Sequence, residues 1–120
     1  MLGSDHPDTL ASINNFANLL QQRGRNGEAE PLYREALATK RRIHPPNHPS
    51  VLMSVNNLGV LLQDMRQWDE AEALLGEALA GRTAMLGEGH EHTRDTAASL
   101  EALRRARRRG GGGGGGGGAR

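Results

Sequence analysis

The sequence repeats itself with a period of 42 residues, and this period limits the folds that the chain can adopt. The matching segments are His6-Pro7 with His48-Pro49, Asn14-Asn15 with Asn56-Asn57, Glu28-Ala29-Glu30 with Glu70-Ala71-Glu72, and Glu35-Ala36-Leu37-Ala38 with Glu77-Ala78-Leu79-Ala80. A fixed period of about 20 to 50 residues is typical of a solenoid, in which one supersecondary unit stacks on its own copies. Such a fold offers an extended surface instead of a catalytic pocket, so the period favours a binding function.

Each period is predicted to contain two helices. Gly24 interrupts the apolar pattern of the first period, and the proline-rich residues 44–47 separate the two periods, since glycine and proline commonly end helices. The expected helices span residues 7–23, 26–42, 49–65, 68–85 and 91–109. The chain has one Phe, one Tyr and one Trp, so the core must be built from Leu, Ala, Val and Ile, which suits close-packed helices.

Two segments carry a family resemblance, and they are Leu2-Gly3-Ser4-Asp5-His6-Pro7 and Gly24-Arg25-Asn26-Gly27-Glu28-Ala29-Glu30. They resemble the 42-residue tetratricopeptide repeat of kinesin light chains and their relatives, and the resemblance covers about residues 2–103. It implies an all-α fold: an α-solenoid of antiparallel helix pairs, with about two and a half repeats and five helices.

We therefore expect a helical tetratricopeptide-repeat domain at residues 1–109, with repeats at about 2–43, 44–85 and, in part, 86–109. Residues 110–118 are an unbroken run of glycine. Glycine has no side chain to bury and loses the most backbone entropy on ordering. Residues 110–120 are therefore expected to form a disordered, glycine-rich tail.

The third period departs from the repeat at positions where a following helix would pack. Glu101 and Arg104 stand one period after Gly59 and Leu62. A charged side chain in these positions is compatible with solvent and not with a helix packed closely on it. The last helix is therefore expected to be a solvated cap on the stack.

The first helix has an apolar stripe wide enough for two neighbouring helices, and Met1 aligns with the end of a second helix, where an earlier repeat would finish. Two expectations follow: the chain is a structural fragment of a longer repeat array, or it self-associates through the uncapped N-terminal helix. Marginal stability is expected because such stacks need about three repeats. Gly76 and Gly81 are each expected to cost about 1 kcal/mol within a helix.

The polar face of the first helix in each period is the candidate binding surface. It is rich in amides, whereas an ordinary solvated helix face is rich in Glu, Lys and Arg. Amides both donate and accept hydrogen bonds, so they can pair with the backbone of an extended peptide. The resemblance places this face on the concave side of the solenoid, where family members bind peptides. The predicted peptide-binding residues are Asn14, Asn18, Gln21, Asn56 and Gln63; alternatively, some of the asparagines brace neighbouring helices.

Several other kinds of site are not expected. Prolines lie between His44 and His48, so these two histidines do not share a helix face and no metal site is predicted. The recurring His6, His48 and His90 are interpreted as structural residues of the repeat. The serines have no recurring histidine and acidic partners that would form a catalytic site, so no enzymatic activity is expected. No cofactor is expected either. The chain has no cysteine, no visible signal peptide and no apolar stretch for a membrane, so a cytoplasmic location is expected.

The leading hypothesis is a scaffold or adaptor module that binds a protein or peptide partner on its concave face, as the resemblance to kinesin light chains implies. An alternative function is suggested by the uneven distribution of charge along the chain. Residues 1–93 contain 8 basic and 12 acidic side chains, whereas residues 94–120 contain 7 and 2. The arginine-rich residues 104–109 offer nucleic acid or an acidic surface a place to bind. They lack the interleaved aromatic side chains that stack on bases, so partner-protein binding is favoured.

Overall fold

The computed structural model of the chain describes residues 7–109. The predicted all-α fold is confirmed: the described residues form α1 (Pro7–Gln22), α2 (Asn26–Ile43), α3 (Pro49–Asp64), α4 (Trp68–Leu86) and α5 (Glu91–Arg109). The predicted helix ends agree with these bounds to within about one residue. The predicted disordered tail at residues 110–120 and His6 lie outside the described residues.

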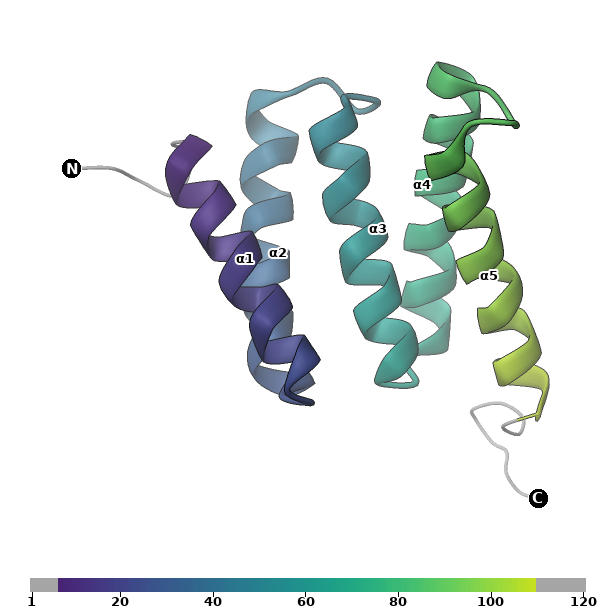
Figure 1. Ribbon diagram of the computed structural model, residues 1–120, viewed down its shortest axis with the longest axis horizontal. Coiled ribbons are helices and arrows are strands. Elements are labelled where there is room, and N and C mark those ends of the chain that lie inside the picture. The colour runs from purple at the N-terminus through teal and green to yellow at the C-terminus, as the bar shows by residue number, and fades with distance from the viewer. Residues whose placement is uncertain (1–6, 110–120) are drawn as a thin grey trace.

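The helices form two layers of antiparallel hairpins (Figure 1). The helices α1, α3 and α5 lie in the front layer, and α2 and α4 lie behind them. The central helix is α3, which packs against α2, α4 and α5, whereas α1 packs mainly against α2. Buried apolar side chains therefore gather around α3, and its own are Val51, Leu52, Val55, Leu58, Leu61 and Leu62. This is the predicted solenoid of stacked helix pairs.

The back layer is tied together by arginine and glutamate pairs on its outer surface. Arg34 of α2 forms a two-pronged pair with Glu70 of α4, with N···O distances of 2.6 and 2.8 Å. Arg41 and Glu77 form a second such pair, at 2.7 and 3.0 Å. Planar guanidinium and carboxylate groups match in this geometry, so the two pairs fix the register of α2 against α4.

The same tight turn ends the first helix in both repeats. Gly24 and Arg66 lie one period apart, and both adopt the left-handed backbone conformation, with φ of 78° and 62°. In the first turn the Arg25 N–H donates to the Leu20 carbonyl oxygen at 2.8 Å, and the equivalent bond recurs one period later. Glycine adopts this conformation freely, whereas the Cβ of Arg66 is strained there.

Two of the recurring histidines cap the first helices of their repeats. The Nδ1 of His48 accepts a hydrogen bond from the Ser50 N–H at 3.0 Å, and that of His90 accepts one from the His92 N–H at 3.0 Å. Both bonds satisfy N–H groups that the first turn of a helix leaves without a partner. His44 stacks on His48, with ring centroids 3.9 Å apart. The structural use predicted for His48 and His90 is confirmed.

The outer face of α5 is solvated, as predicted. Glu101 and Arg104 are exposed, whereas Leu100 and Leu103 are buried in the core. Gly59 of α3 is the residue one period before Glu101. A Cβ on Gly59 would lie only 2.9 Å from a leucine side chain of α4, so glycine is needed at that position. Because no described helix covers the outer face of α5, larger and charged side chains are tolerated on it.

The apolar stripe of α1 is only partly buried. Phe16 and Leu19 are 54% and 43% exposed, whereas Leu58 and Leu61, one period later, are 2% and 0% exposed. The helix equivalent to α1 in the second repeat is α3, and α2 of the preceding repeat packs on it. Among the described residues no preceding helix packs on α1 in the same way. The exposed stripe is the surface on which the expected self-association depends, and self-association stays a prediction.

Two glycines of α4 are expected to respond in opposite ways to substitution by alanine. A Cβ on Gly81 would lie 2.6 Å from the Leu52 Cδ2 of α3, whereas a Cβ on Gly76 meets no atom within 4 Å. Gly76→Ala should therefore raise the free energy of unfolding by about 0.5–1 kcal/mol, since glycine is a poor helix former. Gly81→Ala should lower it by about 1–3 kcal/mol through overpacking. Urea denaturation of both variants tests this, and shifts of the same sign would contradict it.

Candidate functional site

Three of the five predicted binding residues line one shallow groove between α1 and α3. Asn18 and Gln21 reach it from α1, and Asn56 reaches it from α3. The groove has a volume of about 470 Å³ and is completed by Gln22, Tyr33, Asn57, Val60 and Asp64. We call it the amide groove. Its position in the front layer agrees with the first-helix surface predicted from the sequence.

Gln21 is held in the amide groove by a buried tyrosine. The Tyr33 hydroxyl donates to the Oε1 of Gln21 at 2.9 Å, and Tyr33 itself is buried in the core. Burial raises the pKa of the Tyr33 hydroxyl, and this hydroxyl, like that of any tyrosine, is protonated and can donate at neutral pH. The NH₂ group of Gln21 and the second lone pair of its Oε1 are left for a ligand.

Asn56 is part of a hydrogen-bond chain that links three helices. The guanidinium of Arg82 on α4 donates to the Thr96 Oγ1 of α5 at 2.8 Å, and this hydroxyl donates to the Asn56 Oδ1 of α3 at 3.0 Å. Arg82 also donates to the main-chain oxygen of His92 at 3.2 Å. Burial lowers the pKa of Arg82, and the Asp95 carboxylate opposes that effect. Asn56 thus braces neighbouring helices while it lines the groove.

Asn14 lies in a different hollow of the front layer, which we call the Lys40 hollow. It has a volume of about 460 Å³ and is lined by Leu10, Ala11, Asn14, Asn15, Lys40, Ile43, His44, Ser50 and Met53. The Oδ1 of Asn14 is buried and has no hydrogen-bond partner among the described residues. Burial lowers the pKa of the Lys40 ammonium group.

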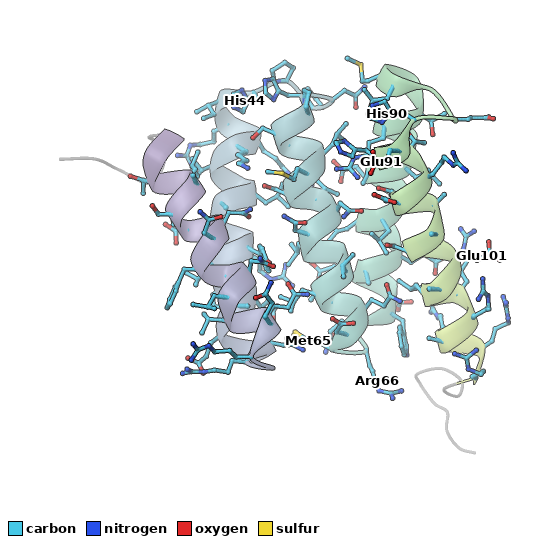
Figure 2. All side chains as sticks on the ribbon, in the orientation of Figure 1. His44, Met65, Arg66, His90, Glu91 and Glu101 are labelled. Carbon is cyan, nitrogen blue, oxygen red and sulfur yellow. The ribbon has the colours of Figure 1, made fainter. Side chains whose placement is uncertain are left out.

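The Lys40 hollow is repeated one period later around Arg82. The matched lining positions are Leu10 and Leu52, Ala11 and Met53, Lys40 and Arg82, Ile43 and Met85, His44 and Leu86, and Ser50 and His92. Both hollows lie toward the end of the molecule where Figure 2 labels His44 and His90, opposite Met65 and Arg66. Large apolar side chains are exposed around both, namely Ile43, Met53, Met85 and Leu86.

Gln63 lies apart from the other predicted binding residues. It lines a hollow between α3 and α5 that includes Arg66, Trp68 and Arg109. This hollow is near the end of α3 that Figure 2 marks with Met65 and Arg66. Helical spacing places Gln63 seven residues after Asn56 on one face of α3, but Gln63 shares its hollow with Ala106 and Arg109 of α5.

Sequence reasoning missed Lys40, although a signal for it was present. Lys40 lies four residues after Ala36 and three after Leu37, so it shares the buried face of α2. Its counterpart one period later, Arg82, is also buried. A basic residue that recurs on an apolar helix face marks a position with special polar contacts, because charged side chains are rarely buried without partners.

The arginine-rich end of α5 is partly engaged within the molecule. Arg107 pairs with Asp69 and Glu72 of α4, and Arg104 pairs with Glu72 at 3.2 Å. Arg105 lies 3.7 Å from Glu101 on its own helix. These pairs reduce the positive charge that this segment can offer to nucleic acid or to an acidic surface.

The described residues contain neither a metal-binding cluster nor a membrane-spanning helix. No group of three or more His, Cys, Asp or Glu side chains within residues 7–109 is arranged to hold a metal ion. In the same part of the chain, no helix has the length and apolar character needed to cross a bilayer.

Comparison with known proteins identifies the repeat. The family model of the tetratricopeptide repeat matches residues 9–50 and 51–92, two consecutive units of 42 residues. Each matched unit begins inside the first helix of one repeat and ends near the start of the first helix of the following repeat. It is therefore the predicted 42-residue repeat with its boundaries shifted along the chain. A search of curated proteins found no match.

Two solved structures from Podosopora anserina are similar to the chain over most of its length. One is described as the nearly identical TPR-like repeats of a kinesin light chain-like protein; it is 29% identical, with a TM-score of 0.83, and the match covers 88% of this chain and 50% of the other. A variant of that protein is 27% identical, with a TM-score of 0.77, and the match covers 90% and 51%. The chain thus spans about half the length of these solved chains.

Two threonines of α5 provide a matched test of the hydrogen-bond chain. Both Thr93 and Thr96 are buried, but the Thr96 hydroxyl links Arg82 to Asn56, whereas the Thr93 hydroxyl has no partner among the described residues. Thr96→Val should lower the free energy of unfolding by about 1–3 kcal/mol because it leaves buried polar groups unpaired. Thr93→Val should leave it unchanged or raise it. Thermal denaturation of both variants checks this, and equal destabilisation would contradict the assignment.

Proposed function

Because the chain belongs to the tetratricopeptide repeat family, we propose that it is a protein-interaction module of the scaffold or adaptor type. An extended segment of a partner protein lies along the amide groove in this proposal. The similarity to kinesin light chain-like repeats supports a partner-binding role. The proposed location is the cytoplasm, because a chain without cysteine has no need of an oxidising compartment.

The observation that carries the proposal is the convergence of side-chain amides from two helices in one groove. Asn18 and Gln21 of α1 face Asn56 of α3 across a shallow hollow. An extended peptide presents alternating N–H and C=O groups, and amide side chains can satisfy both. The apolar side chain of Val60 lies in the same groove and offers contact to an apolar side chain of the peptide.

Two of the groove amides are already held in place before a ligand binds. The Oε1 of Gln21 is bonded to Tyr33, and the Oδ1 of Asn56 is bonded to Thr96. Their NH₂ groups are the donors proposed to bind peptide carbonyl oxygens. A side chain fixed in advance loses little rotamer freedom on binding, which favours affinity.

Asn18 is the residue best suited to test this function. It is exposed and lines the groove, so its truncation should not disturb the core, whereas truncation of Asn56 would also break the chain to Arg82. Peptides selected from a random library on the full chain are titrated against each variant by calorimetry. Asn18→Ala should weaken binding about three- to tenfold, the effect of losing one hydrogen bond.

Gln67→Ala is the matched control, because Gln67 is an exposed amide in the turn before α4. It should bind the selected peptides as the wild type does. Failure to select any binding peptide, or equal weakening by Asn18→Ala and Gln67→Ala, would refute the proposed groove.

A further inference from the structure

One helix surface is open in the first repeat and covered in the second. Phe16 and Leu19 form an apolar stripe on α1 and are 54% and 43% exposed, whereas Leu58 and Leu61, at the same positions of α3, are 2% and 0% exposed. We call Phe16 and Leu19 the α1 stripe. In Figure 1 α1 forms one edge of the stack, and no described helix lies on its outer side. The second repeat therefore shows how a helix packs on a surface of this kind.

In the second repeat the covering helix is α2, and ion pairs hold it in place. α2 packs on α3 through its buried residues, while Arg34 and Arg41 of α2 reach Glu70 and Glu77 of α4 with N···O distances of 2.6 to 3.0 Å. The two arginines are seven residues apart, which is about two helical turns, so they project from the same face of α2. The covering helix thus combines a buried stripe with two cations at a fixed spacing.

The first repeat has carboxylates at the positions that would complete the same arrangement. Glu28 and Glu35 of α2 stand one period before Glu70 and Glu77. Glu35 is exposed and has no ion-pair or hydrogen-bond partner in the described part of the chain. The Glu28 side chain is 58% exposed and pairs with its neighbour Arg25 at 2.8 Å, but a carboxylate can accept several hydrogen bonds at once.

We propose that the α1 stripe, together with Glu28 and Glu35, binds an amphipathic helix of a partner protein that carries two arginines seven residues apart. The helix lies antiparallel to α1 and parallel to α2. Its apolar side packs on the α1 stripe, and its two arginines pair with the two glutamates. Arginine suits these positions better than lysine because a guanidinium and a carboxylate form two parallel hydrogen bonds.

The α1 stripe is separate from the amide groove. None of its residues, and neither of the two glutamates, lines that groove. The partner helix and the peptide of the amide groove are therefore independent ligands, and either one can be tested without the other.

The charges favour the helix of another protein over a second copy of this chain. Among the described helices only α2 carries two arginines seven residues apart, and α2 is already packed within its own stack. Two copies docked face to face would each bring Glu28 and Glu35 to the interface, where like charges repel. A foreign helix with two arginines meets the same carboxylates with opposite charge.

The probe is a synthetic peptide of residues 25–44 of this chain, which contains α2 and both of its arginines. It is titrated against the ¹⁵N-labelled full chain by NMR, which detects weak binding by a peptide that is only marginally helical when free. The shifted amides should lie around Phe16, Leu19 and Glu35. A peptide with Arg41→Glu should bind about three- to tenfold more weakly, because an ion pair is lost and a repulsion replaces it.

A reversed pair of charges identifies the contact. Glu35→Arg in the full chain should restore the binding of the Arg41→Glu peptide to within about twofold of the unmodified pair, because the ion pair is rebuilt with opposite signs. The peptide is the same in both titrations, so a change in its helicity does not explain the recovery. Glu88→Arg is the matched control, since Glu88 is an exposed carboxylate in the turn between α4 and α5. It should leave the Arg41→Glu peptide weakly bound.

Phe16→Ser tests the apolar part of the surface. It should weaken the binding of the unmodified peptide by about tenfold or more, because it removes most of the apolar contact area. Phe16 is more than half exposed, so circular dichroism should show the same helix content as in the wild type.

Equal binding of the two peptides would overturn the inference, and so would a failure of Glu35→Arg to restore binding or a recovery that Glu88→Arg also produces. Amide shifts spread over α3 and α4 would show that the peptide displaces α2, which also contradicts it. In sedimentation equilibrium, a dimer that Phe16→Ser dissociates would show that the occupant is a second copy. None of these outcomes affects the test of the amide groove through Asn18.

Discussion

The structure depends on the packing of α3 against three other helices. Its apolar residues lie against α2, α4 and α5, and Leu58, Leu61 and Leu62 are almost completely buried. This packing requires close approach, which Gly59 of α3 and Gly81 of α4 make possible because neither contributes a Cβ at the contact. The outer helices have fewer neighbours, so α3 with α4 forms the stable centre from which α1 and α5 extend.

The 42-residue register makes one repeat a reference for the other. Where both repeats make the same contact, as in the histidine caps and the left-handed turns, the contact belongs to the fold. Where they differ, the contact belongs to one repeat alone. The polar chain from Arg82 to Asn56 braces the second repeat, whereas in the first repeat the Asn14 Oδ1 and the Ser54 Oγ are buried without a hydrogen-bond partner among the described residues. Leaving a buried polar group unpaired costs about 1–3 kcal/mol.

The fold could be predicted from the sequence because the period, the glycines and the prolines fix the lengths of the helices and the positions of the turns. The exposed cap at Glu101 could be predicted for the same reason, since register identifies where a charged residue replaces glycine. The candidate site was predicted in part. Helical spacing brought Asn18, Gln21 and Asn56 to one groove, but it did not show that Gln63 faces α5.

The remaining features depend on contacts between individual side-chain atoms, which the position of a residue in the repeat does not determine. Periodicity shows that Thr96 and Ser54 are equivalent, yet it does not show that the Thr96 hydroxyl is bonded to Arg82 while the Ser54 Oγ has no partner among the described residues. The bond from Tyr33 to Gln21 likewise depends on side-chain lengths and rotamers across two helices. Such contacts depend on how the side chains of one helix fit between those of its neighbour. A pattern of residues along the sequence does not contain that information.

Native-state amide hydrogen exchange, resolved by residue, tests the central role of α3 most directly. Exchange reports the free energy of the opening that exposes each amide. The slowest exchange is expected in the middle of α3 and the facing part of α4, with faster exchange in α1, whose outer stripe is exposed, and in the last turns of α5. Protection of α1 equal to or greater than that of α3 would contradict the account.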